Sequence, residues 1–144
     1  MAAEGYNVMN SVGREVRINK GYAESIDGVL LTVQDKYLAI LTPGGRIVYL
    51  NKSFIKSISE GDAPTDSSPA VKPVTAGSMY GLLRALRQQE VKMNLGGNDQ
   101  AQGIVMEANS RYVTLVTARQ EVVNIPVTRI RWVTTEGRNT SRGN

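Results

Sequence analysis

The chain has 144 residues, of which 41% are hydrophobic and 21% charged, a composition typical of a folded protein. It contains no cysteine and no histidine, which excludes disulfides, thiolate nucleophiles, histidine acid–base catalysis and the commonest zinc sites. The formal net charge is +4, and the whole excess lies after residue 110, where six arginines stand against two glutamates. The basic character is therefore local to the C-terminal end.

The N-terminal residues have neither the basic start nor the apolar core of a signal peptide, and no run approaches the ~20 apolar residues of a membrane span. We therefore expect a protein made in the cytoplasm, without a signal peptide or a membrane span. The carboxylates considered for acid–base work, Glu15, Asp27, Asp35 and Glu90, have no catalytic motif around them and predict solvated strand edges. We expect no enzyme activity, no cofactor and no metal.

The sequence aligns with itself, without a gap, when it is shifted by 75 positions. Glu-Val-Arg-Ile-Asn at 15–19 falls on Glu-Val-Lys-Met-Asn at 90–94, Gly28 falls on Gly103, and Tyr37 falls on Tyr112. Because the register holds over about 45 residues, the pattern predicts two copies of one unit.

Each copy consists of short runs rich in Val, Ile, Leu, Thr and Tyr, separated by turn residues, which predicts a small barrel or sandwich of five strands. Strands are expected in the first copy at 15–19, 25–33, 37–42, 46–50 and 55–59. An apolar helix is expected at 78–89, followed by strands at 90–95, 100–107, 111–117, 121–125 and 130–134. Gly28 and Gly103, in the middle of the second strand of each copy, predict a bend.

Residues 60–77 contain three prolines among small and acidic residues, which predicts a linker. The predicted organisation is a first barrel with its N-terminal segment at 1–59, the linker at 60–77, a second barrel with its helix at 78–135, and a polar tail at 136–144. The turn Thr-Pro-Gly-Gly at 42–45 fits a type II turn, whereas its counterpart at 117–120 has no glycine and predicts another turn type.

The second copy carries a family resemblance in five segments. They are Leu-Leu-Arg-Ala-Leu-Arg-Gln-Gln-Glu-Val-Lys-Met at 82–93, Gly-Ile-Val at 103–105, Tyr-Val-Thr-Leu at 112–115, Val-Asn-Ile-Pro at 123–126 and Ile-Arg-Trp-Val at 130–133. This order resembles the Sm-like barrel, an SH3-type fold. Within that group the chain is similar to the small, functionally unassigned Sm-like proteins of Bacillus and related spore-formers, some of which are spore-associated. The resemblance implies an all-β fold with short helices, in two tandem five-stranded barrels.

The RNA pocket of Sm proteins does not transfer with this resemblance. The family places an aspartate and then an asparagine around its third strand, but the first copy has Asp35 with Ala39, and the second has Ser110 with Thr114. The basic-glycine pair between strands four and five is absent from both copies. The resemblance therefore implies the fold and not base recognition.

Trp132 is the only tryptophan, and the 75-residue shift places it on Ser57. A position that accepts serine in one copy is not required by a shared core. We therefore expect Trp132 at an interface, either between the two barrels or with another chain.

We expect a non-enzymatic, structural, self-assembling protein, with a spore coat or related spore layer as its location. Barrels of this type leave strand edges open, and edge pairing between subunits would give homo-oligomeric rings or filaments, or contacts with other coat proteins. The residues expected at these contacts are Ile47, Val48, Tyr49 and Leu50, their counterparts Val122, Val123, Asn124 and Ile125, and Arg131 with Trp132.

The alternative is an RNA- or single-stranded-DNA-binding Sm-like module, in which aromatic residues stack on bases and arginines neutralise phosphates. Its candidate residues are Arg111, Tyr112, Arg129 and Arg131. A third possibility, an adaptor for a peptide, has no visible aromatic groove. Steep loss of nucleic-acid affinity with added salt would distinguish the binding module from a structural protein.

Overall fold

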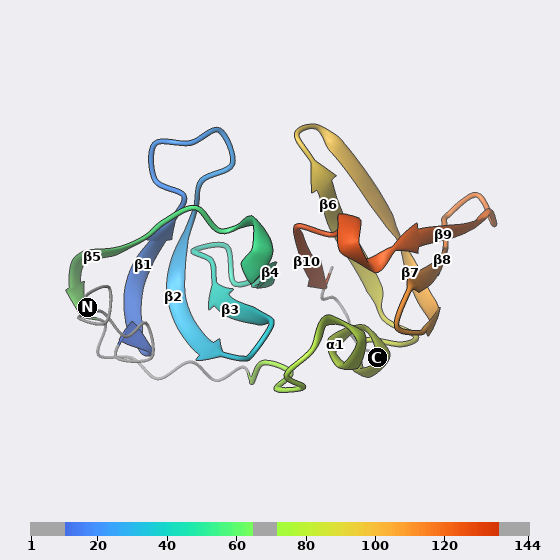
Figure 1. Cartoon of the computed structure of the whole chain (residues 1–144), viewed down its shortest axis with the longest axis horizontal. Helices are drawn as coiled ribbons and strands as arrows, with labels where there is room; N and C mark the ends of the chain where they lie inside the picture. The colour runs from blue at the N-terminus through green and yellow to red at the C-terminus, as the bar shows by residue number, and fades with distance from the viewer. Residues whose placement is uncertain (1–10, 65–71, 136–144) are drawn as a thin grey trace.

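The computed structural model describes residues 11–64, the first half, and residues 72–135, the second half (Figure 1). The first half holds β1 (Arg14–Ile18), β2 (Ile26–Val33), β3 (Tyr37–Leu41), β4 (Ile47–Asn51), the 3-10 turn η3 (Lys52–Phe54) and β5 (Ile58–Pro64). The second half holds α1 (Met79–Ala85), β6 (Glu90–Gly96), β7 (Asp99–Ala108), β8 (Tyr112–Val116), β9 (Val122–Pro126), the 3-10 turn η4 (Val127–Arg129) and β10 (Trp132–Thr135). The predicted polar tail lies outside the described residues.

All ten strands in the described residues belong to one antiparallel sheet, in the order β5-β1-β2-β3-β4-β10-β6-β7-β8-β9. The β-rich class and the helix before the second half are therefore as predicted, but the sheet does not close, and the two expected barrels are not separate sheets. The physical reason is that β10 pairs on one side with β6 and on the other with β4 of the first half. Hydrogen bonding thus continues from one half into the other.

The two halves use the same registers at a constant offset. Val16 faces Gly28 across β1 and β2, and Val91 faces Gly103, 75 residues further on, across β6 and β7. A Cβ at Gly28 would lie 2.5 Å from the carbonyl oxygen of Leu41, and one at Gly103 would lie 2.7 Å from that of Val116. Glycine is required at both positions because the backbone of the neighbouring third strand leaves no room for a Cβ.

The turns between the third and fourth strands share one hydrogen-bond pattern, and the prediction of a type II turn at 42–45 is wrong, because the positive φ lies at the fourth residue of each turn and not at the third. The N–H of Gly45 donates to the carbonyl of Thr42, and the N–H of Gln120 donates to that of Thr117, both at 2.9 Å. Gly45 has φ 89° and Gln120 has φ 68°. Glutamine therefore adopts the left-handed backbone that the turn demands, at an energetic cost that glycine avoids.

Helix α1 is shorter than the predicted 78–89. Ser78 caps its start, since its Oγ accepts from the N–H of Gly81 at 2.9 Å. The helix ends at Ala85, and Gln88 follows with φ 69°, which turns the chain into β6. Met79, Leu82, Leu83 and Leu86 face inward, so the segment acts as an apolar cover and not as a long surface helix.

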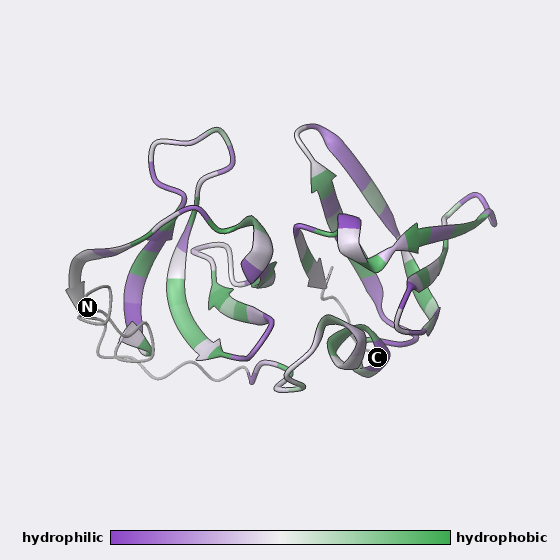
Figure 2. Cartoon of the chain, in the orientation of Figure 1, coloured by the Kyte–Doolittle hydropathy of each residue, from purple (hydrophilic) through white to green (hydrophobic). Residues whose placement is uncertain are grey.

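Two hydrophobic cores lie in the sheet. The first contains the inward residues of the first half, among them Ile18, Leu38 and Ile40. The second contains the inward residues of the second half and α1, and also Tyr37, Ala39 and Tyr49 from the first half. Strand β3 is consequently buried on both faces, whereas exposed and covered positions alternate along β8, and hydrophilic and hydrophobic residues alternate along β6 and β7 (Figure 2).

Candidate assembly interface

The joint between the halves is the pairing of β4 with β10. Leu50 faces Trp132, Tyr49 faces Val133, and Val48 faces Thr134 in antiparallel register. Asn51 extends the joint, because its N–H donates to the carbonyl of Arg131 at 2.9 Å and its Nδ2 donates to that of Ile130 at 3.0 Å. The Thr134 hydroxyl donates to the carbonyl of Ile47 at 2.7 Å.

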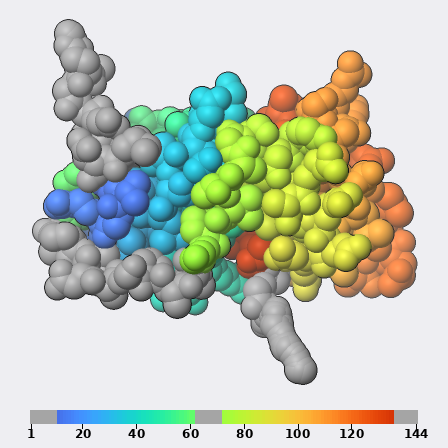
Figure 3. Space-filling model, turned by 90° about the horizontal axis from the view of Figure 1, so that it is seen from below, coloured from blue at the N-terminus to red at the C-terminus, as the bar shows by residue number. Residues whose placement is uncertain are grey.

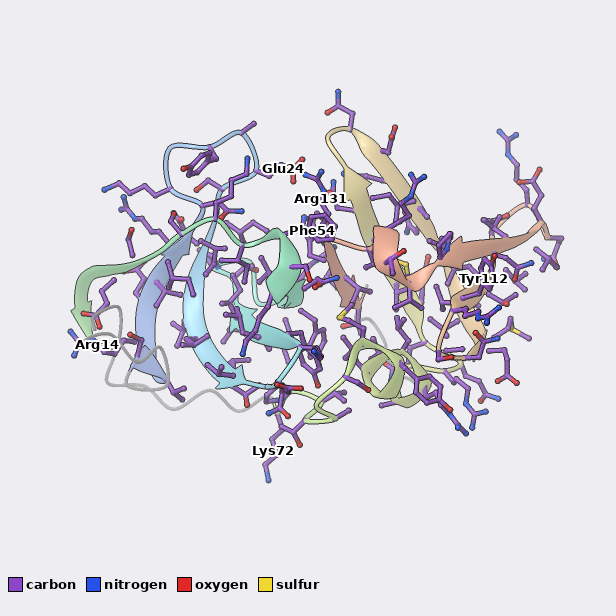
Figure 4. All side chains as sticks on the ribbon, in the orientation of Figure 1. Arg14, Glu24, Phe54, Lys72, Tyr112 and Arg131 are labelled. Carbon is purple, nitrogen blue, oxygen red and sulfur yellow. The ribbon has the colours of Figure 1, made fainter. Side chains whose placement is uncertain are left out.

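A polar clasp at one end of the joint is centred on Glu24, in the loop between β1 and β2. Arg131 Nη1 donates to its Oε1 at 2.9 Å, and the N–H of Gly97 donates to its Oε2 at 2.6 Å, so one carboxylate holds two segments of the second half. The Arg131 guanidinium also lies 4.9 Å from the centre of the Phe54 ring (Figure 4). The Gly97 N–H, and then Arg131, lower the pKa of Glu24 despite partial burial.

Two buried tyrosines of the first half hold the segment that leads into α1. The Tyr37 hydroxyl donates to the carbonyl of Val74 at 2.7 Å and accepts from the N–H of Ala76 at 2.8 Å, while the Tyr49 hydroxyl accepts from the N–H of Val74 at 3.0 Å. Burial raises the pKa of both phenols. Figure 3 shows this segment, in yellow-green, lying between the two halves.

Four predicted interface residues of the first half lie inside this joint. Val48, Tyr49 and Leu50 are buried and Ile47 is partly buried, all on β4 between β3 and β10. Trp132 lies between Leu50 and Asn94 in the sheet, and its half-buried ring packs on the first core. Arg131 is in the clasp.

Their counterparts on β9 lie at the end of the sheet. Among the described strands, β9 pairs with β8 alone, and β5 at the opposite end pairs with β1 alone. Val122 is 66% exposed and Asn124 is also exposed, whereas Val123 is partly buried and Ile125 is buried against the second core. The two predicted edges thus differ: β4 is paired with β10 of the same chain, whereas the outer side of β9 is not paired with any described strand.

The nucleic-acid candidates are not brought together as one site. Arg111 and Tyr112 are exposed at the start of β8, and Arg129 is exposed in the nearby turn η4. Arg131 lies at the joint, on the other side of the second half from Tyr112 (Figure 4). Its guanidinium is already engaged by Glu24 and Phe54.

Sequence reasoning missed Glu24, Asn51 and Gly97, which carry the polar contacts of the joint. Their role depends on contacts 73 to 107 residues away along the chain, and no local pattern marks them. The alignment of the two copies did contain one signal for Asn51, because the 75-residue shift places it on Pro126. Proline has no N–H, so the two copies differ at this position in their capacity to pair with another strand.

The joint and the end strands of the sheet are the candidate sites of the described residues. Within the described ranges, no three histidine, cysteine, aspartate or glutamate residues cluster as metal ligands would. No helix in the part of the chain that the structure describes is long and apolar enough to span a membrane.

Comparison with known proteins gives one informative similarity. The chain matches none of the protein-family models. It is 31% identical over 116 residues, 79% of its length, to Spore coat protein B of Bacillus subtilis (strain 168). The match spans only 30% of that protein's length, so the chain corresponds to a part of it.

Proposed function

We propose that this protein is a non-enzymatic, structural component of a bacterial spore coat, and that its chains assemble through the outer strands of their sheets. The similarity to Spore coat protein B supports the location. The observation that carries the assembly is the β4–β10 pairing, because it joins two similar units through strand edges within a single chain. The same chemistry, repeated between chains, would produce rings or filaments.

Both ends of the sheet are suited to strand addition. Strand β9 and strand β5 are the outermost described strands, so one side of each has no partner among them. An outer strand presents a row of backbone donors and acceptors that another strand satisfies well. A chain with two such ends joins a partner at each of them, which is the requirement for growth beyond a dimer.

The alternation of hydrogen bonds identifies the outward groups of β9. The carbonyl of Glu121 accepts a hydrogen bond from the N–H of Thr117, and the N–H of Val127 donates to the carbonyl of Arg111. Because backbone groups alternate in direction along a strand, the N–H and carbonyl groups of the odd-numbered residues between them point toward β8. The N–H groups of Val122 and Asn124 therefore point away from the sheet. Pro126 has no N–H, which leaves these two as the outward donors of the strand.

A single substitution tests the role of this edge. Asn124→Pro removes an outward N–H without removing a bond to β8, and should abolish rings or filaments seen by negative-stain electron microscopy and return the protein to monomers in sedimentation velocity. Asn124→Ala is the matched control, because both variants lose the 2.6 Å contact with Thr114 and only the proline loses the N–H. Equal assembly of the two variants would contradict edge pairing at β9.

A second candidate function is nucleic-acid binding by the exposed group Arg111, Tyr112 and Arg129. Its support is that Tyr112 is 46% exposed next to Arg111, and that η4, which carries Arg129, is hydrogen-bonded to Arg111 through the N–H of Val127. If this function holds, the protein purifies with nucleic acid, its affinity falls by orders of magnitude with added salt, and assemblies are absent. Nucleic-acid-free rings or filaments would exclude it as the principal function.

A further inference from the structure

The outer faces of the two halves correspond residue by residue but differ in burial. In the first half the face of β2–β3–β4 is formed by Leu31, Tyr37, Ala39, Leu41, Ile47 and Tyr49. The corresponding outer face of β7–β8–β9 is formed by Met106, Tyr112, Thr114, Val116, Val122 and Asn124. Tyr37 is fully buried, whereas Tyr112 is 46% exposed. Ile104, Met106 and Val122 add exposed fractions of 43%, 50% and 66% to the second face.

The chain itself shows what covers the first of these faces. Tyr37, Ala39 and Tyr49 belong to the core of the second half, where they meet Met79, Leu82 and Val133. The cover is therefore the following unit: its β10 lies beside β4, its leading segment is hydrogen-bonded to Tyr37, and its α1 shares a core with the face. The second face keeps large exposed apolar side chains, although Thr114 and Asn124 make its centre polar, and no such cover lies on it in the described residues.

From this correspondence we infer that the outer face and edge of β7–β8–β9 form a docking surface for the first half of a second copy, in the register of the internal joint. The inference rests on the proposed function and adds the surface, the partner segment and the direction of assembly. Strand β5 of the second copy takes the place beside β9 that β10 takes beside β4. Assembly is consequently head to tail, with one kind of joint throughout.

The register follows from the internal joint by the 75-residue offset. Val48 faces Thr134 within the chain, so Val123 faces Ser59 of the second copy, and Asn124 faces its Ile58. In the internal joint the Thr134 hydroxyl donates to the carbonyl of Ile47. In the proposed joint the corresponding hydroxyl of Ser59 donates to the carbonyl of Val122. The outward N–H and carbonyl of Asn124 meet those of Ile58, as Tyr49 meets Val133.

The charges at the ends of this joint are complementary. Glu24 and Arg131, which form the internal clasp, correspond to Asp99 and Lys56. Both Asp99 and Lys56 are exposed, and Lys56 Nζ lies 4.7 Å from the centre of the Tyr22 ring, close enough to the loop between β1 and β2 to help lower the pKa of Glu24. A carboxylate on the docking surface thus meets an ammonium group on the incoming half.

The register can be tested by disulfide capture, without background, because the chain has no cysteine. Val123 and Ser59 correspond to a pair that does not exchange backbone hydrogen bonds, a type with Cα atoms about 4.5 Å apart, within disulfide range. The double variant S59C/V123C, oxidised mildly at assembling concentration, should give a ladder of dimers, trimers and longer species on a non-reducing gel. Each single variant should stop at dimers.

The matched control moves one cysteine by a single residue. In S59C/N124C the second side chain points to the opposite face of the strand, so the ladder should be lost or reduced at least about ten-fold in yield. Equal ladders from the two double variants, or no ladder from S59C/V123C although electron microscopy shows assemblies, would overturn the head-to-tail joint and leave self-assembly standing. Absence of assemblies in the unmodified protein at any concentration would instead contradict the proposed function.

Discussion

Strands β4 and β9 occupy the same place in the two halves, yet β4 lies inside the sheet and β9 lies at its end. Their backbones agree even at the last residue, where Asn51 has φ −67° and ψ 121° and Pro126 has φ −61° and ψ 130°. The difference is in the side chains, because Asn51 gives the joint two hydrogen bonds that proline cannot give. The same backbone shape therefore lies inside the sheet in β4 and at its end in β9, and the side chain of the last residue distinguishes the two strands.

The largest expected effect comes from the two corresponding tyrosines. Tyr37→Ala removes a fully buried ring and both of its hydrogen bonds, and should lower the free energy of unfolding by about 3–5 kcal/mol. Tyr112→Ala should change it by less than about 1 kcal/mol in the monomer, because the ring is half-exposed. Urea unfolding of both variants measures the difference. Similar losses of unfolding free energy would contradict the idea that the face with Tyr37 is buried and the face with Tyr112 is exposed.

The last residues of β4 and β9 give the next effect. Asn51→Ala should cost about 2 kcal/mol of unfolding free energy, since the buried carbonyl of Ile130 loses its donor. Pro126→Asn, at an almost identical backbone, should tighten association between chains about ten-fold by restoring donors to the edge. Calorimetric melting and sedimentation equilibrium are the respective measurements. Unchanged association of Pro126→Asn would argue against β9 as the partner edge.

The Glu24 clasp predicts a pH dependence of the internal joint. Because the folded-state pKa of Glu24 is lowered, its ionised form stabilises the fold above the unfolded-state pKa, and this stabilisation is lost as pH falls through the folded-state pKa. Glu24→Gln should therefore cost about 1 kcal/mol at neutral pH and little on the acidic side of that transition. Thermal melting of both proteins across acidic pH checks this. A difference that persists unchanged at low pH would exclude charge as the cause.

The smallest effect concerns the two hairpin turns. Gln120→Gly should raise the free energy of unfolding by about 0.5 kcal/mol, because glycine adopts φ 68° without steric cost but has more freedom when unfolded. Gly45→Ala, at φ 89°, should lower it by about 1 kcal/mol and serves as the reciprocal control. Denaturant titration resolves both, and a loss of stability in Gln120→Gly would contradict the shared turn.

Local pattern was sufficient to predict most strands, the helix before the second half and the special positions of the two strand glycines, for which the structure shows close backbone approach. These features depend on residues near one another in sequence, such as the apolar runs around Gly28 and Gly103. The single continuous sheet was not predictable, because the pairing of Leu50 with Trp132 joins residues that no periodicity links. The type II prediction was wrong at 42–45, where the left-handed residue is the fourth, Gly45, as Gln120 is in the second half.

The sequence was sufficient to predict where part of the candidate interface lies, but not which residues contact one another in it. Trp132 was singled out because Ser57 replaces it, and it lies where the halves meet. The clasp could not be predicted, since nothing near Glu24 in the sequence indicates that Gly97 and Arg131 will approach it.

The two-sided burial of β3 has a consequence for how the molecule unfolds. Its residues contribute to both cores, so neither core survives intact if the other opens. Heat or denaturant should therefore melt the two halves in one cooperative transition, and a fragment that stops before residue 72 would expose the rings of Tyr37 and Tyr49 to water. We therefore expect the two halves, although similar in sequence, to unfold as one thermodynamic unit.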